Sequence, residues 1–110
     1  MYSELKINKL ISGTVDKIIT IPSDKIIEFH SIEIFSEHST KGCRISILDD
    51  VNGDMSCLDE IGLYLNNATK TSELIDKYLE GNEKRRVILR CEQLSGGAYE
   101  VDASLKYKFK

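Results

Sequence analysis

The stretch that decides the fold is SGGAYEVDASLKYKFK, residues 95–110. Apolar side chains occupy every second position from Tyr99 to Phe109, and polar or charged side chains occupy the positions between them. A period of two is typical of a β-strand that has one face in a core and the other in solvent. Because chain ends usually fray, so regular a strand in the last residues predicts that neighbouring strands hold it in place.

The residues just before this stretch predict its partner. Residues 86–94 also alternate, and Gly96-Gly97 separates them from the last strand. Glycine readily adopts the positive φ that short hairpin loops require. We therefore expect residues 86–94 and 98–109 to pair as a β-hairpin.

Most of the remaining sequence also has the period of a strand. Further strands are predicted at 4–11, 14–21, 25–37, 43–49 and 61–67. Pro22 ends the second of these, because proline has no amide hydrogen. Segment 25–37 is apolar on both faces, as in a central strand, and its faces change near His30-Ser31, which predicts a β-bulge. Residues 49–60, DDVNGDMSCLDE, read as a loop from their composition.

One segment departs from the strand period. Leu74, Ile75, Tyr78 and Leu79 recur at helical spacing. Thr71 or Ser72 can cap the start of such a helix and Gly81 can close its end. The pattern predicts one short amphipathic helix near 72–80.

Seven to eight short strands with one helix predict an all-β fold, an antiparallel and jelly-roll-like β-sandwich. The chain has 110 residues, of which 41% are hydrophobic and 30% charged. That length and balance are typical of one globular domain. We expect a single β-sandwich domain over residues 1–110.

Charge and cysteine content narrow the class of protein. The net charge of −3 is small and the charges are interspersed, which disfavours nucleic acid and acidic lipid as partners. MYSELKINKLISG at the start has no apolar run long enough for a signal peptide, and no later segment is long enough to span a bilayer. We therefore expect a cytoplasmic setting with reduced thiols. Cys43 and Cys91 stand in alternating segments and are interpreted as core residues, and Cys57 as a third unbonded thiol.

No set of residues predicts a catalytic or cofactor-binding site. His30 and His38 have no acidic partner at a recognisable spacing, and no serine lies in a nucleophile motif. We expect His30 to be buried and hydrogen-bonded within its strand.

The loop at 49–60 resembles a cation site only in part. Asp50, Asn52 and Asp54 supply oxygens at alternate positions. An EF-hand loop also needs a glycine where Met55 stands and an acid where Ile61 stands. We therefore expect no metal and interpret Asn52-Gly53 as a β-turn.

Two basic clusters, Lys84-Arg85-Arg86 and the lysines at 106, 108 and 110, would form one stripe if their strands were paired. Such a stripe can contact phosphates or an acidic partner. With a net negative chain, solvated strand faces are the better interpretation.

Two stretches resemble small phage virion proteins that have a β-sandwich fold. Residues 12–36, SGTVDKIITIPSDKIIEFHSIEIFS, resemble their opening, in which a Gly-Thr strand leads to a proline turn and a long strand that changes register around a serine. Residues 72–109, SELIDKYLEGNEKRRVILRCEQLSGGAYEVDASLKYKF, resemble their other end, with a Gly-Gly turn and a last strand that ends in an aromatic residue and lysines. The resemblance implies a head-decoration, head-fibre or tail-associated component that is assembled in the host cytoplasm, is oligomeric and is not an enzyme. It names no functional residues.

The expected partners are therefore other copies of the chain and a larger capsid or tail protein. Tyr107 and Phe109 need cover, and because LKINKLI near the start alternates weakly, we expect neighbouring copies in a closed ring, most simply a trimer, to provide it. A carbohydrate-binding module is the alternative, disfavoured by the absence of tryptophan and by only 7% aromatic residues. A small enzyme on the same scaffold would need clustered histidines and carboxylates, for which His30 is the one candidate.

Overall fold

The computed structural model describes residues 2–11, 13–36, 43–63, 68–74, 77–93 and 99–110. These residues form nine strands: β1 (Ser3–Ile11), β2 (Thr14–Thr20), β3 (Ile26–Ser36), β4 (Cys43–Val51), β5 (Asp54–Leu63), β6 (Ala68–Glu73), β7 (Tyr78–Glu80), β8 (Arg85–Gln93) and β9 (Tyr99–Phe109). Within the described part of the chain no helix is long and apolar enough to cross a membrane.

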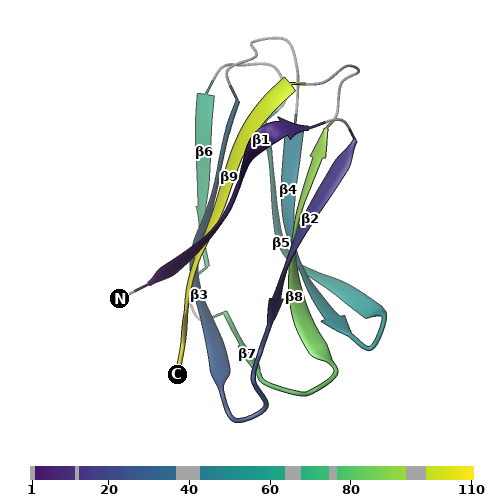
Figure 1. Ribbon diagram of the computed structural model, residues 1–110. Helices are drawn as coiled ribbons and strands as arrows, with labels where there is room; N and C mark the ends of the chain where they lie inside the picture. Colours follow the sequence, from purple (N-terminus) through teal and green to yellow (C-terminus); the bar gives the residue numbers. More distant parts are fainter. Residues whose placement is uncertain (1, 12, 37–42, 64–67, 75–76, 94–98) are drawn as a thin grey trace.

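The strands form two antiparallel sheets that face each other as layers (Figure 1). Sheet A has the order β1-β9-β3-β6, and β7 pairs with the first residues of β3. Sheet B has the order β2-β8-β4-β5. This arrangement confirms the all-β, antiparallel and jelly-roll-like sandwich.

One hydrophobic core fills the space between the sheets. Both sheets contribute side chains to it at alternate strand positions, as the period of two predicts. Its largest fully buried members are Ile7, Ile21, Ile27, Ile32, Ile34, Ile45, Ile47, Leu74, Leu89 and Leu105.

The expected position of β9 within a sheet is confirmed, but its expected partner is wrong. β9 pairs with β1 on one edge and with β3 on the other, whereas β8 pairs with β2 and β4 in the opposite sheet. Alternation shows that a strand has one buried face and does not show which strand lies beside it. Leu89 of β8 and Leu105 of β9 thus meet in the core between the sheets. Gly96-Gly97 lies outside the described residues.

The expected helix near 72–80 is also wrong for the residues described there. β6 ends at Glu73 and β7 begins at Tyr78. The long strand β3 offers its edge to this segment: the Leu74 amide donates to the His30 carbonyl at 2.8 Å, and the Phe29 amide donates to the Lys77 carbonyl at 3.0 Å. These strand contacts satisfy backbone groups of β3 that a helix would leave unpaired. Residues 75–76 lie outside the described part.

The segment expected as a loop at 49–60 is mostly strand. β4 continues to Val51 and β5 begins at Asp54, with only a two-residue turn between them. Asn52 has a φ of 55° and Gly53 a φ of 92°, the positive values that short hairpin turns demand. The predicted Asn-Gly turn is therefore confirmed, while charged residues that suggested a longer loop continue the strands.

The predicted bulge in β3 is confirmed. The register between β3 and β9 shifts between Phe29 and Ser31, which leaves His30 as the extra residue. Bulges turn a side chain away from the regular alternation. His30 is consequently exposed, and the expectation that it is buried is wrong.

Candidate functional site

The outer face of sheet B carries an apolar row that crosses all four strands. Ile18 of β2 lies opposite Ile88 of β8, Ile88 opposite Leu48 of β4, and Leu48 opposite Cys57 of β5. We call these four residues the apolar band. Neighbouring side chains leave only 3% of Ile88 exposed, whereas Ile18 is 48% exposed. Met55, beside the band on β5, is 49% exposed.

Ion pairs lie on both sides of the apolar band. Toward one end of the strands, Arg90 donates to both carboxylate oxygens of Asp16, at 2.9 and 3.0 Å. The same hydrogen bonds raise the pKa of Arg90. Beyond them Arg44 donates to Glu92 at 2.9 Å. The outer face of sheet B therefore alternates between apolar and charge-paired rows.

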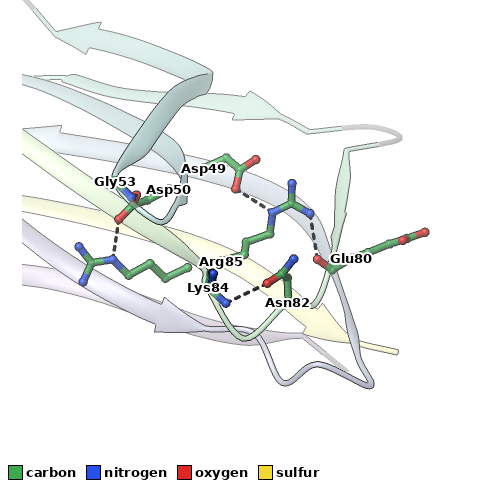
Figure 2. A network of polar contacts seen from close by, with 8 residues as sticks. Asp49, Asp50, Gly53, Glu80, Asn82, Lys84 and Arg85 are labelled. Carbon is green, nitrogen blue, oxygen red and sulfur yellow. Dashed lines mark hydrogen bonds and ion pairs between the residues drawn. The ribbon is translucent and has the colours of Figure 1, made fainter.

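At the other end, the β4–β5 hairpin holds a second set of polar contacts (Figure 2). Arg85 Nε donates to Asp49 at 3.1 Å, and Arg86 Nε donates to Asp50 at 2.6 Å. The second oxygen of Asp50 accepts from the Gly53 amide at 2.8 Å. The Arg86 hydrogen bond holds the pKa of Asp50 below its ordinary value. Both oxygens of Asp50, a residue of the suspected cation loop, thus bind protein donors.

The outer face of sheet A is hollowed and polar. Pairing in sheet A places Lys6, Ser104, Glu33 and Thr71 in one row across the strands, and Glu4, Lys106, Ser31 and Glu73 in the next. These eight residues and His30 line a hollow of about 360 Å³. We call it the polar hollow.

Aromatic rings flank the polar hollow. The exposed His30 ring stacks on Tyr2, with centroids 4.5 Å apart and an interplanar angle of 26°. Lys108 Nζ lies 5.0 Å from the centre of the Tyr2 ring. Tyr78 of β7, opposite Glu28, is 61% exposed and lines a separate hollow with Lys77 and Lys110. Sequence reasoning misses the ring pair at the polar hollow, because Tyr2 precedes the first strand and His30 is expected to be buried.

The two basic clusters do not form one stripe, because they lie on opposite sheets. Arg85 and Arg86 belong to β8 in sheet B and bind aspartates. Lys106 and Lys108 belong to β9 in sheet A, and Lys110 directly follows it. Lys110 pairs with Glu28 at 2.8 Å, and this hydrogen bond lowers the pKa of Glu28.

The three cysteines are free thiols. Cys43 and Cys91 are buried in the core, as expected, and burial raises their pKa values to about 11 and about 12. Cys57 is exposed on the outer face of sheet B. No group of three or more histidine, cysteine or acidic side chains suited to a metal ion occurs among the described residues. His38 lies outside them.

Comparison with known proteins bears on the fold. No protein-family model matches the chain, and no curated protein matches it by sequence. Among solved structures, PirA superposes with a TM-score of 0.60 at 10% identity and covers 94% of this chain and 93% of its own. The Yersinia pseudotuberculosis-derived mitogen superposes with a TM-score of 0.57 at 14% identity, over 98% of this chain and 86% of the mitogen.

A structure of infectious bursal disease virus, strain Gx, matches with a TM-score of 0.43 at 10% identity, over 97% of this chain and 30% of the viral chain. A superposition with a TM-score below 0.5 is too weak to support a shared fold or function. The first two similarities show the fold alone, and a fold of this kind hosts many functions.

Proposed function

We propose that this protein is a non-enzymatic virion component that self-associates through the apolar band and binds a larger capsid or tail protein. The apolar band is the observation that carries the self-association. The four side chains of this row lie on the outer face of sheet B and are not members of the core cluster between the sheets. The virion assignment rests on the resemblance of residues 12–36 and 72–109 to phage virion proteins.

Burial of the apolar band between two copies would supply the favourable free energy of association. Covering Ile18 and Met55 removes apolar surface from water, at about 25 cal/mol per Å². Between them, Ile88 is already buried and Leu48 is half-buried, so the exposed ends of the band contribute most of the apolar surface that a contact would cover. Cores of protein interfaces combine such apolar centres with polar surroundings.

Charge complementarity selects a second copy of the chain as the occupant. β8 and β4 are the two central strands of sheet B. A two-fold axis that runs along the strands, between two such faces, sets β8 of one copy over β4 of the other. Because Arg86 and Asp50 share a row, Arg86 then faces Asp50 of the second copy.

The same rotation aligns the other rows. Glu92 faces Arg44 of the second copy, and Ile88 faces Leu48. A two-fold axis across the strands would instead set Arg86 against Arg90 on facing β8 strands. The charge pattern thus favours a two-fold axis along the strands, which leaves the strands of the two facing sheets nearly aligned. Nearly aligned strands are usual where two sheets pack face to face.

The trimer stays a prediction, and its premise applies to one of its two residues. It assumed that neighbouring copies must cover Tyr107 and Phe109 of β9. Tyr107 packs against the core of its own subunit, whereas Phe109 is 40% exposed. The dimer across sheet B is proposed from the apolar band and does not depend on cover for these two residues.

Sedimentation velocity over a series of protein concentrations tests the proposal. The intact chain should form a dimer, and Ile18→Lys combined with Met55→Lys should leave a folded monomer, because each lysine places a charge in the contact. Thr71→Lys, on the exposed outer face of sheet A, is the matched control and should dimerise as the intact chain does.

Two results would overturn the proposed assembly. One is an intact chain that stays monomeric at the highest concentration reached. The other is a lysine double variant that has the native circular dichroism spectrum and dimerises as strongly as the intact chain.

A further inference from the structure

We infer that the polar hollow on sheet A binds a neutral oligosaccharide. The hollow lies on the face opposite the apolar band, so this inference stands independently of the proposed self-association. A site of about 360 Å³ falls within the range of roughly 300–1,000 Å³ that is usual for small-molecule sites.

The chemistry of the lining matches hydroxyl groups. A sugar hydroxyl donates one hydrogen bond and accepts others, so it needs a donor and an acceptor close together. Lys6 and Lys106 are donors, and the glutamates at 4, 33 and 73 are acceptors. Ser31, Ser104 and Thr71 have hydroxyls that do both. Donors and acceptors alternate across the two rows, whereas a site for one anion would gather donors alone.

The charges of the lining side chains favour a neutral ligand over an anionic one. Three glutamates and two lysines line the hollow, so its carboxylates outnumber its ammonium groups. Phosphate groups are bound where lysine and arginine predominate. A neutral polyol meets no net repulsion and can satisfy both kinds of charge.

The aromatic rings give the second recognition element. Sugar rings present flat C–H faces that pack on aromatic faces, and rings with a polar edge suit a site that is half apolar and half wet. The β3 bulge turns His30 outward, where one face of its ring stacks on Tyr2 and the side chain lines the hollow. A sugar ring would pack on the face of His30 that is turned away from Tyr2, and its hydroxyls would bond the polar side chains of the lining. This combination distinguishes a glycan from an ion.

Regular strands hold these groups in place before any ligand binds. Lys6, Ser104, Glu33 and Thr71 come from four adjacent strands in fixed register. Thr71 donates to Glu33 at 3.2 Å, and Lys6 pairs with Glu4 at 3.1 Å. These internal pairs orient the side chains that a sugar hydroxyl would bridge. Such preorganisation lowers the entropy cost of binding.

The test is a titration of ¹⁵N-labelled protein with cellohexaose, maltohexaose and N-acetylchitohexaose, followed by ¹H–¹⁵N spectra. At least one of them should cause saturable shifts in amides of β1, β3, β6 and β9 around the hollow. Glu33→Gln, which keeps the shape of the side chain, should weaken that binding by about tenfold, as expected when one charged hydrogen bond is lost.

Glu60→Gln, on the outer face of sheet B, is the matched control and should leave the affinity unchanged. The inference is overturned if none of the three sugars causes saturable shifts at millimolar concentration. It is equally overturned if the shifts map to sheet B, or if Glu60→Gln weakens binding as much as Glu33→Gln. None of these results depends on whether the chain forms a dimer.

Discussion

Asp50 is almost fully buried at the end of β4, and its charge is stabilised by a hydrogen bond and ion pair with Arg86 and by the Gly53 amide. A buried carboxylate is costly unless such partners are present. Its lowered pKa means that protonation is harder in the folded state than in the unfolded state. The stabilisation is therefore complete above the ordinary pKa of aspartate, and it disappears as the pH falls through the lowered value.

Asp50→Asn should accordingly lower the free energy of unfolding at neutral pH. The same substitution should lower it much less in acid. Asparagine can still accept from the Gly53 amide, so the turn is kept while the pairing of charges with Arg86 is lost. Urea unfolding at about pH 7 and about pH 3, on either side of the ordinary carboxyl pKa, measures the difference. Asp24→Asn, in the exposed turn after Pro22, is the control. An equal loss at both pH values would show that the charge of Asp50 is unimportant.

Single residues were predicted well where one local rule decides them. Pro22 ends a strand, Asn52-Gly53 forms a tight turn, and Cys43 and Cys91 lie in the core. His30 was predicted wrongly because a bulge reverses the side on which a side chain lies. The sequence located that bulge, but it could not show whether the extra residue turns inward or outward.

Strands were located better than their partners. Alternation is a property of one strand and its two faces, so it predicted β9 without predicting β1 and β3 as its neighbours. The segment at 72–80 shows that helical spacing can mislead. Leu74 reaches the core just after β6 and Leu79 reaches it from β7, and both strands pair with β3. The polar hollow depends on this same pairing of distant strands, and no spacing along the sequence shows it.

The junction between β7 and β8 depends on Gly81. Its amide donates to the Lys25 carbonyl at 2.7 Å, which joins this junction to the turn between β2 and β3. A Cβ added here would lie 2.7 Å from the Lys25 oxygen and closer still to the Pro22 carbonyl. Both are backbone atoms, which cannot rotate away.

Gly81→Ala should therefore destabilise the protein by about 1–3 kcal/mol, the usual cost of overpacking. Chemical denaturation measures this change. Ser23→Ala, exposed in the turn that Gly81 contacts, should change the free energy of unfolding by less than about 0.5 kcal/mol. An alanine variant as stable as the parent would mean that the two turns separate easily.

At the scale of the whole molecule, one core joins both sheets, and this predicts a single cooperative unit. Ile32 and Leu105 come from sheet A, and Ile45 and Leu89 from sheet B, within one cluster. Neither sheet can keep a buried face if the other unfolds. The prediction of one domain over residues 1–110 therefore has a thermodynamic test.

Native-state hydrogen exchange should give the same opening free energy for the slowest amides of β9 and β3 as for those of β8 and β4. The outer edges of β1 and β2, which pair with no strand among the residues that the structure describes, should exchange faster and serve as the internal reference. Slowest amides that differ clearly in free energy between the sheets would mean that the sheets unfold separately.

The place of β9 between β1 and β3 also has a consequence for synthesis on the ribosome. β1 is made before the other strands of the sandwich and β9 after them, yet each residue from Ser3 to Ile11 pairs with β9. The nascent chain must therefore carry β1 and one edge of β3 unpaired until β9 has been made. Sheet B has all its strands by Gln93 and can assemble earlier. Exposed strand edges promote aggregation, so this order of synthesis favours a chaperone that shields β1 until β9 has been made.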